Sequence, residues 1–214
     1  MTNLWTGILA EVLSPFYYHG LYVPSGGATD ATILTDTAVI FALAHTFGIP
    51  PTRLPRSTPD YAADLARIPW RATLFQAPNG YNPTLPPVRH IVDVDREGGN
   101  QVSMQRNMAS GNFKKFWWVH EVAPSAQYVG ALWGPNPFEW AGNPEIIIRV
   151  GVGRMGLVRL KATTVPDQVV LNGATTALWG YSVPEDYRIL DTIRVSYPLS
   201  LKEATTIWMA SLNP

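Results

Sequence analysis

The sequence predicts one domain of the α+β class, in which strands dominate and a buried helix follows the first strand. Of the 214 residues, 46% are apolar and only 15% are charged. This composition supplies a sizeable core and excludes wholesale disorder. Neither an internal repeat nor a linker long enough to divide the chain occurs, so residues 1–214 are expected to form a single domain.

The first strand and the first helix have the clearest local signals. Residues 3–13 are rich in apolar side chains and predict a buried strand. A helix is expected over 37–47, because Thr35 and Asp36 can cap its start and Gly48 can stop it. This helix is apolar on almost every side, which is typical of a buried helix.

The rest of the chain alternates strands with turn-rich segments. A short helix is expected over 58–67, with Thr58 as N-cap and Pro59 in its first turn. Further strands are expected over 70–77, 88–94, 116–121, 128–133, 145–150, 157–164 and 168–171. Residues 97–112 are polar and contain glycine, which is typical of a protruding hairpin, and 201–212 fit either a helix or a strand.

Charges are balanced overall but unevenly placed. The chain has 16 basic and 16 acidic residues, and 13 of the basic ones fall within 53–161. Residues 103–120 and 149–161 contain no acid at all. Their basic side chains are Arg106, Lys114, Lys115, Arg149, Arg154, Arg159 and Lys161. Zero net charge excludes binding of nucleic acid by bulk charge. The two stretches could hold phosphates locally, although such runs are more commonly solvated strand faces.

A glycine-rich segment, Gly-Val-Gly-Arg-Met-Gly, occupies residues 151–156 and includes Gly151 and Gly153. It fits the G-x-G-x-x-G pattern of dinucleotide-binding folds, which also requires a following helix. Residues 157–166 alternate and end at a proline, so a strand follows instead. We therefore predict a glycine-rich turn between two strands, where a backbone or a ligand approaches closely.

Basic and aromatic side chains are interleaved in Lys-Lys-Phe-Trp-Trp-Val-His, residues 114–120. Single-stranded nucleic acid is held by this combination, because cations track phosphates while rings such as that of Trp117 or Tyr17 stack on bases. A core strand with aromatic side chains pointing inward is the alternative, and it is the commoner use of such residues.

Nothing in the sequence compels an enzyme. The chain has no cysteine, and its four histidines are too scattered for a metal site, so neither a metal nor another cofactor is expected. No basic residue precedes the first apolar run, and Glu11 interrupts it, which argues against a secretory signal. The longest apolar stretch, 37–49, is too short to span a bilayer. We expect a cytoplasmic protein without membrane contact.

Four segments resemble CRISPR RAMP proteins, specifically the Cas-five group of type I-D interference complexes. They are Leu-Thr-Asp-Thr-Ala-Val-Ile-Phe-Ala-Leu at 34–43, Pro-Asp-Tyr-Ala-Ala-Asp-Leu at 59–65, Asn-Met-Ala-Ser-Gly-Asn-Phe-Lys at 107–114 and Ile-Ile-Arg-Val-Gly-Val-Gly-Arg-Met-Gly at 147–156. Thr37 stands where that group has an aromatic residue. The resemblance implies a ferredoxin-like, RRM-like RAMP core with β-rich insertions and extensions, including a thumb-like hairpin around 97–112.

The resemblance also implies a non-catalytic subunit that caps the 5′ handle of the guide RNA (crRNA) in a type I surveillance complex, or Cascade. Neighbouring backbone and large subunits are the implied protein partners, with target DNA near the PAM end as a further candidate. The basic residues named above would neutralise phosphates, and Gly151 and Gly153 would let the RNA backbone come close. Two alternatives remain. One is a RAMP endoribonuclease that processes repeat RNA with His120 or His19 as general base, and the other is an aromatic-rich assembly module without RNA contact.

Overall fold

A computed structural model of the chain describes residues 4–18, 21–23, 26–28, 30–49, 60–93, 114–151 and 155–210. Its strands are β1 (Trp5–Val12), β2 (Leu21–Val23), β3 (Gly26–Ala28), β4 (Ile33–Leu34), β5 (Arg71–Ala72), β6 (Phe75–Gln76), β7 (Val88–Asp93), β8 (Lys114–His120), β9 (Gln127–Trp133), β10 (Glu145–Val150), β11 (Gly156–Thr163), β12 (Gln168–Val169), β13 (Glu185–Leu190), β14 (Ile193–Ser196) and β15 (Leu199–Ser200). Its helices are α1 (Asp36–Thr46), α2 (Tyr61–Arg67), α5 (Pro137–Ala141), α6 (Gly173–Leu178) and α7 (Leu201–Ala210). The predicted α+β class, rich in strands, is confirmed.

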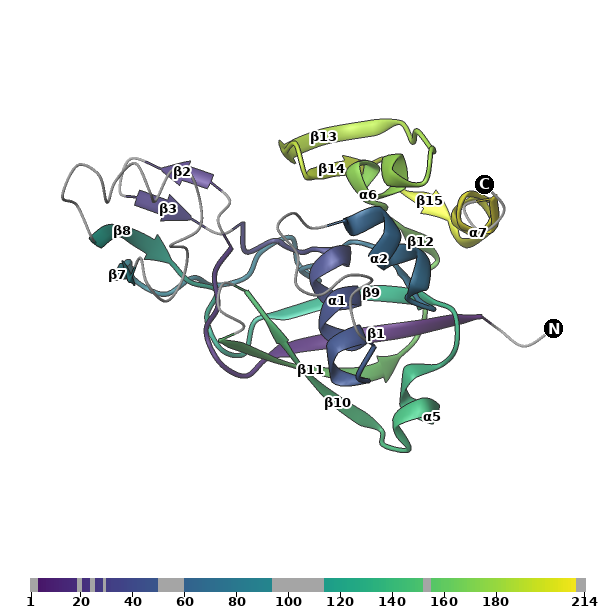
Figure 1. Ribbon diagram of the computed structural model, residues 1–214, viewed down its shortest axis with the longest axis horizontal. Coiled ribbons are helices and arrows are strands. Elements are labelled where there is room, and N and C mark those ends of the chain that lie inside the picture. Colours follow the sequence, from purple (N-terminus) through teal and green to yellow (C-terminus); the bar gives the residue numbers. More distant parts are fainter. Residues whose placement is uncertain are drawn as a thin grey trace.

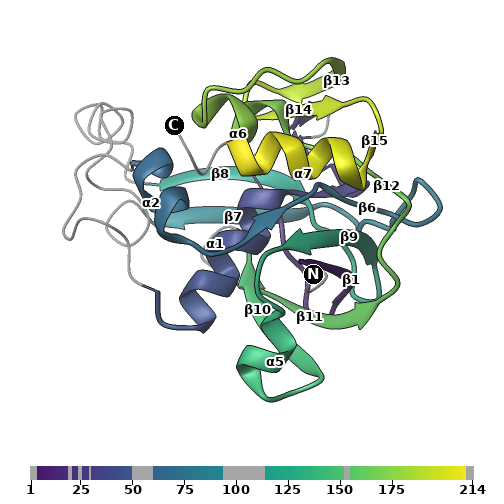
Figure 2. The same ribbon diagram turned by 90° about the vertical axis from the view of Figure 1, so that its right-hand side faces the viewer.

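A curled seven-stranded sheet forms the centre of the molecule (Figure 1, Figure 2). Its order is β10-β11-β1-β9-β6-β4, with β5 also paired to β9, and every pairing is antiparallel. Strand β1 lies between β11 and β9, where it pairs along almost its whole length. This central position explains why the strand that begins the fold is so apolar.

The two faces of the sheet are covered by different parts of the chain. Successive side chains of a strand point to opposite faces. Ile8 and Ala10 of β1 are fully buried in the main core, which they share with Ile40 of α1. Trp5, on the opposite face, packs on Trp208 of α7, with ring centroids 4.9 Å apart. Helix α1 therefore covers one face, and the C-terminal helix covers the other.

A smaller sheet, in the order β2-β3-β8-β7, lies at the opposite end of the molecule from α7 (Figure 1). Strands β7 and β8 pair antiparallel from Val88 opposite Val119 to Asp93 opposite Lys114. The predicted thumb-like hairpin at 97–112 falls between these strands and lies outside the described residues.

The expected strand over 70–77 is present in two pieces, β5 and β6, which both pair with β9. Between them, the Thr73 N–H donates to the Ala131 carbonyl (3.0 Å), and the Thr73 hydroxyl accepts the Ala131 N–H (2.9 Å). The Leu74 N–H donates instead to the Val170 carbonyl (2.8 Å), so the regular ladder is interrupted at Thr73 and Leu74. The cap of the next helix also differs from expectation, since Asp60 accepts the N–H of Ala63 (3.0 Å) at the start of α2.

The C-terminal segment is a helix, which resolves the ambiguity at 201–212. Ser200 and Glu203 form a reciprocal capping box: Glu203 accepts the Ser200 N–H (2.8 Å), and the Ser200 hydroxyl accepts the Glu203 N–H (3.3 Å). Helices α5 and α6 and the β13–β14 hairpin were not predicted from the sequence. Within the described residues, no helix has the length and apolar character needed to cross a membrane.

Candidate functional site

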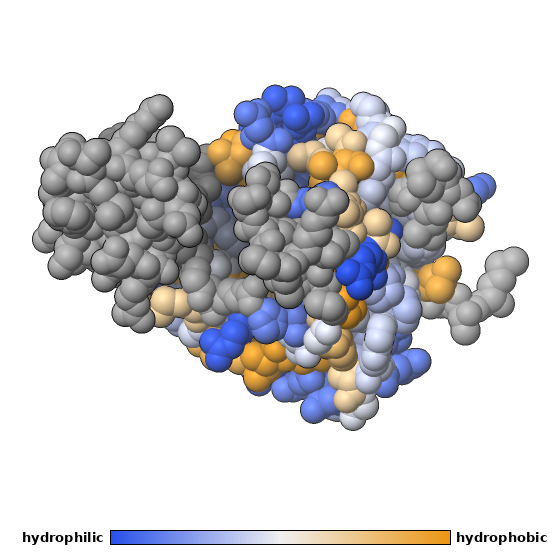
Figure 3. Space-filling view, viewed as in Figure 1, coloured by the Kyte–Doolittle hydropathy of each residue, from blue (hydrophilic) through white to orange (hydrophobic). Residues whose placement is uncertain are grey.

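An open groove of about 970 Å³ runs along the side of α1 that faces away from the sheet. Ala38, Phe41 and His45 of α1 line its floor. One wall comes from α6 and the turn between β13 and β14, and the other comes from the end of β10. On the side of the molecule shown in Figure 3, the described residues form apolar and polar patches side by side. This groove brings residues of α1, α6, β10 and the β13–β14 turn together on one concave surface.

The apolar character of α1 has two structural causes. Val39, Ile40 and Leu43 are almost completely buried against the sheet, which accounts for one side of the helix. Ala38 and Phe41 are partly exposed and line the groove, which accounts for the other. The prediction of a buried helix is therefore confirmed for one side, whereas the other side lines the groove, although both sides are apolar in the sequence.

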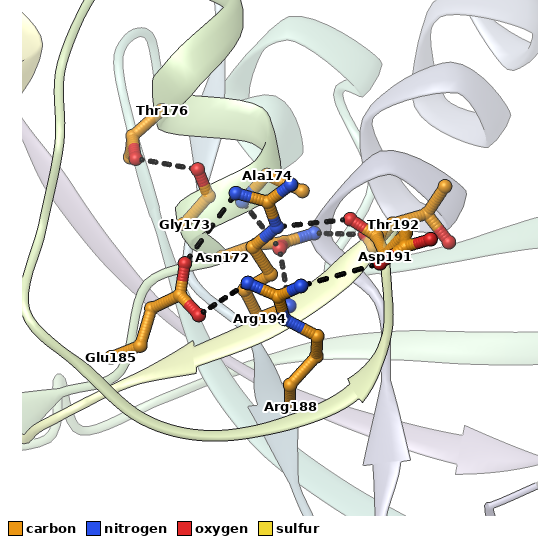
Figure 4. Close-up of polar contacts among 9 residues, drawn as sticks. All are labelled: Asn172, Gly173, Ala174, Thr176, Glu185, Arg188, Asp191, Thr192 and Arg194. Atoms are coloured by element: carbon orange, nitrogen blue, oxygen red, sulfur yellow. Dashed lines mark hydrogen bonds and ion pairs between the residues drawn. The ribbon is translucent and has the colours of Figure 1, made fainter.

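Asn172 joins α6 to the β13–β14 turn (Figure 4), and it also connects this wall of the groove to the start of α1. Its amide nitrogen donates to the carboxylate of Asp36, the first residue of α1, and to the Thr192 carbonyl, each at 3.0 Å. Its amide oxygen accepts the N–H groups of Ala174 and Arg194, each at 3.1 Å. One buried side chain thus joins α1, α6 and β14, and it fixes the turn that forms the rim.

Asp36 is a buried carboxyl group beneath the groove, with only 2% of its surface exposed. Burial raises the pKa of Asp36 from 3.8 to about 6, because the charged form loses its water. Hydrogen bonds from Asn172, Thr175 and backbone N–H groups oppose this shift in the pKa. The carboxyl group therefore exchanges a proton close to neutral pH.

The rim formed by the β13–β14 hairpin carries matched charges. Glu185 pairs with Arg188 (3.2 Å) and with Arg194 (3.5 Å), and Asp191 pairs with Arg188 (3.3 Å). The Arg194 Nε–H also donates to the Asp191 carbonyl (3.1 Å). These two cations and two anions cancel, and Asp186 on the same hairpin adds a further negative charge, so this rim offers no net positive charge to a ligand.

The predicted glycine-rich turn joins β10 to β11, so the strand that follows it excludes a dinucleotide-binding fold. Gly151 has a φ of +79°, and a Cβ atom there would lie 2.9 Å from the Cβ atom of Phe16. A Cβ atom on Gly156 would lie 2.4 Å from the same atom. The close approach that these two glycines permit is therefore one between segments of this chain. Gly153 and Arg154 lie outside the described residues.

Arg149 is the predicted basic residue that the structure brings to the groove, together with Gly151. It lies near the end of β10 and is exposed. Among the described residues, no acid forms an ion pair with Arg149. A cation without a fixed anionic partner is available to a phosphate or carboxylate ligand.

Arg159 and Lys161 face the outer side of the sheet, and both are already paired. Arg159 lies 2.8 Å from Glu11 on β1 and 3.7 Å from Glu145 on β10, and Lys161 lies 3.1 Å from Glu145. The stretch is free of acids in sequence, but the antiparallel register places Glu11 opposite Arg159 and Glu145 opposite Lys161. The charge predicted for phosphate contact is largely neutralised at these two positions.

The remaining predicted contacts belong to the smaller sheet or to undescribed segments. Lys114, Lys115 and Trp117 lie on β8, where they pair with Asp93, Val92 and His90 of β7, and their side chains lie outside the description. Arg106 also lies outside the described residues. The choice between stacking platform and core strand for this segment stays open. Within the part of the chain that is described, no cluster of His, Asp or Glu could hold a metal ion.

The structural likeness of the chain to solved proteins is weak. No protein-family model matches the chain, and no curated protein matches it. A chain of the type III-B Cmr-beta complex, solved by cryo-electron microscopy with cognate target RNA and AMPPnP bound, superimposes with a TM-score of 0.42 and 9% sequence identity. The match covers 91% of this chain and 84% of that one. Likeness at this level carries no argument about function, which has to be inferred from the chain's own residues.

The sequence did not reveal the groove, because its walls come from segments far apart in the chain. Asn172 and Asp36 are separated by 136 positions, yet they share a hydrogen bond. The one local indication of the groove in the sequence was the apolar outer side of α1, but a fully buried helix is apolar on that side as well. Thr175 and Thr176 follow Asn172 in the wall that α6 contributes, but two neighbouring threonines in a sequence do not by themselves indicate a groove.

Proposed function

We propose that the chain is a non-catalytic RNA-binding subunit of a CRISPR effector complex, and that it holds the 5′ handle of the guide RNA. Two of the segments that resemble the Cas-five group, 34–43 and 147–156, fall on α1 and on the β10–β11 turn. Both segments border the groove. In a type I complex, the neighbouring backbone and large subunits would then cover other faces of the chain.

The strand order supports a ferredoxin-like core within the larger sheet. Such a core has the chain order β-α-β-β-α-β. Here β1, α1, the β5–β6 pair, β9, α5 and β11 follow one another in that order, and β11, β1, β9 and β6 are neighbours in the sheet. Strand β10 is then an addition at the edge, and α5, with five residues, is a much shortened second helix.

The observation that carries the proposal is the exposed Arg149 beside the glycine-rich turn. A guanidinium group at a groove can bind a phosphate through two parallel hydrogen bonds. Arg159 and Lys161 contribute less, because Glu11 and Glu145 already neutralise them. We therefore expect RNA binding to depend more on Arg149 than on either of these residues.

The test is equilibrium binding of a 5′-labelled CRISPR repeat RNA to the full chain over a series of salt concentrations. We expect Arg149→Ala to weaken binding about fivefold or more and to reduce the slope of log K against log salt by about 0.7, the value for one phosphate contact on a single strand. Lys202→Ala is the matched control, because Lys202 is an exposed cation on α7, away from the groove. Equal effects of the two substitutions would contradict the role of Arg149.

A second measurement tests the absence of catalysis. Incubation of the purified chain with repeat RNA should leave the RNA intact, while the complex should isolate with bound guide RNA and a raised 260/280 nm absorbance ratio. Cleavage that disappears in His120→Ala would favour the endoribonuclease alternative. A preparation that contains its protein partners but no RNA would instead favour an assembly module.

A further inference from the structure

We infer that the groove along α1 accepts one unstacked nucleotide of the bound RNA, with its base against Tyr61 and Phe41 and its phosphate at Arg149. This inference rests on the proposed function and adds the ligand and its orientation. All three residues line the same groove. Its volume of about 970 Å³ lies at the upper end of the range of clefts that hold small ligands, about 300–1,000 Å³.

The aromatic part of the groove suits a base. The rings of Tyr61 and Phe41 meet edge to face with their centroids 5.8 Å apart. Tyr61 is 55% exposed, so its ring presents a free surface, whereas Phe41 is only partly exposed and holds that ring in place. Unstacked bases commonly stack on exposed aromatic side chains in proteins that bind single-stranded RNA.

The charges of the groove indicate at which end the phosphate of the nucleotide lies and at which end its base lies. The acids at the hairpin rim, Glu185 and Asp191, are paired with Arg188 and Arg194. Arg149 is the cation of the groove for which the described residues supply no ion-pair partner. The phosphate is therefore expected at the β10 wall, and the base over α1 and α2.

The polar groups between these ends suit the edge of a base or a ribose. Thr37 and Thr192 line the groove with side chains that are at least partly exposed. A hydroxyl group both donates and accepts hydrogen bonds, so these side chains can serve either kind of group on the nucleotide. An apolar floor with a few polar groups is the composition expected of a site that buries a flat heterocycle.

Tyr61 is the residue to change, because it is exposed and its loss leaves the core intact. We expect Tyr61→Leu to weaken binding of the repeat RNA about tenfold, which lies within the range for loss of one base–aromatic stack. Tyr61→Phe keeps the ring and should bind within twofold of the wild type. Tyr81→Leu is the matched control, because Tyr81 is a 70% exposed tyrosine that does not line the groove.

Photocrosslinking with RNA that carries 5-iodouridine at single positions gives a direct readout. We expect one position to crosslink strongly to Tyr61 or Phe41, and this adduct to be lost in Tyr61→Leu. If the wild type binds no RNA, the proposed function itself fails. If Arg149→Ala weakens binding but Tyr61→Leu does not, and no adduct maps to α1 or α2, the nucleotide assignment alone is overturned. Loss of a protein subunit from Tyr61→Leu with unchanged RNA binding would make the groove a protein site and would also overturn it.

Discussion

Asp36→Asn tests whether a buried carboxyl group under the groove controls the stability of the fold. Asp36 lies at the start of α1 and joins that helix to the groove wall through Asn172. Burial raises the pKa of its carboxyl group from 3.8 to about 6 in the folded chain. The folded protein therefore binds this proton more tightly than the unfolded chain does, and the ionised form lowers the free energy of unfolding.

The size and the pH window of the effect follow from the two pKa values. A shift of about two pH units corresponds to about 3 kcal/mol at most. This cost is fully present above the folded-state pKa of about 6 and is relieved as the pH falls toward the ordinary value of 3.8. Between pH 7 and pH 5, the relief amounts to about 1 kcal/mol.

Urea unfolding of the wild type and Asp36→Asn at pH 5, 6, 7 and 8 measures this effect, because the asparagine has no proton to exchange in this range. The difference in unfolding free energy between variant and wild type should shift by about 1 kcal/mol in favour of the wild type from pH 7 to pH 5. Asp167→Asn, which removes an exposed carboxyl group, is the matched control. A difference for Asp36→Asn that is constant over this range would refute the raised pKa.

Two further substitutions test the packing around the site. Gly156→Ala should destabilise the fold by about 1–3 kcal/mol in thermal unfolding, because the new Cβ atom would meet the Cβ atom of Phe16 at 2.4 Å; unchanged stability would contradict this contact. Asn172→Ala should cost about 3 kcal/mol in urea unfolding, since it leaves a buried carboxyl group and two backbone N–H groups without their partner. Asn143→Ala, which removes one exposed bond to the Glu145 N–H, is its control and should cost less than about 1 kcal/mol.

Elements with complete local signals could be predicted from the sequence. Helix α1 begins one residue before the expected position, because Thr35 accepts the Ala38 N–H at the N-cap as its residue type suggests. Gly48, with a φ of +68°, takes the left-handed conformation expected just after a helix. The strand expected over 145–150 is confirmed with the same bounds as β10, and its buried and exposed residues alternate in the structure.

Features that depend on distant segments could not be predicted in this way. The ladder break at Thr73 requires the Val170 carbonyl, which lies almost a hundred positions along the chain. The wall of the groove at α6 depends on a hydrogen bond between the buried amide of Asn172 and Asp36, and no pattern in the sequence predicts this bond. The capping box of Ser200 and Glu203 is different, because its S-x-x-E pattern was visible and would have settled the C-terminal helix.

The charge pattern shows most clearly that strand register decides which basic residues are paired with acids. The basic stretch 149–161 looked uniform, but Arg159 and Lys161 are paired with Glu11 and Glu145, whereas Arg149 lines the groove and has no ion-pair partner among the described residues. Cations that acids of the chain already neutralise, such as Arg159 and Lys161, add little affinity through counterion release. The hold of the chain on RNA should therefore depend on stacking and shape in the groove, and its affinity should fall less steeply with salt than that of a basic RNA-binding domain. That shallow dependence is what a subunit needs if it is to keep a single RNA end in place while neighbouring proteins hold the rest of the strand.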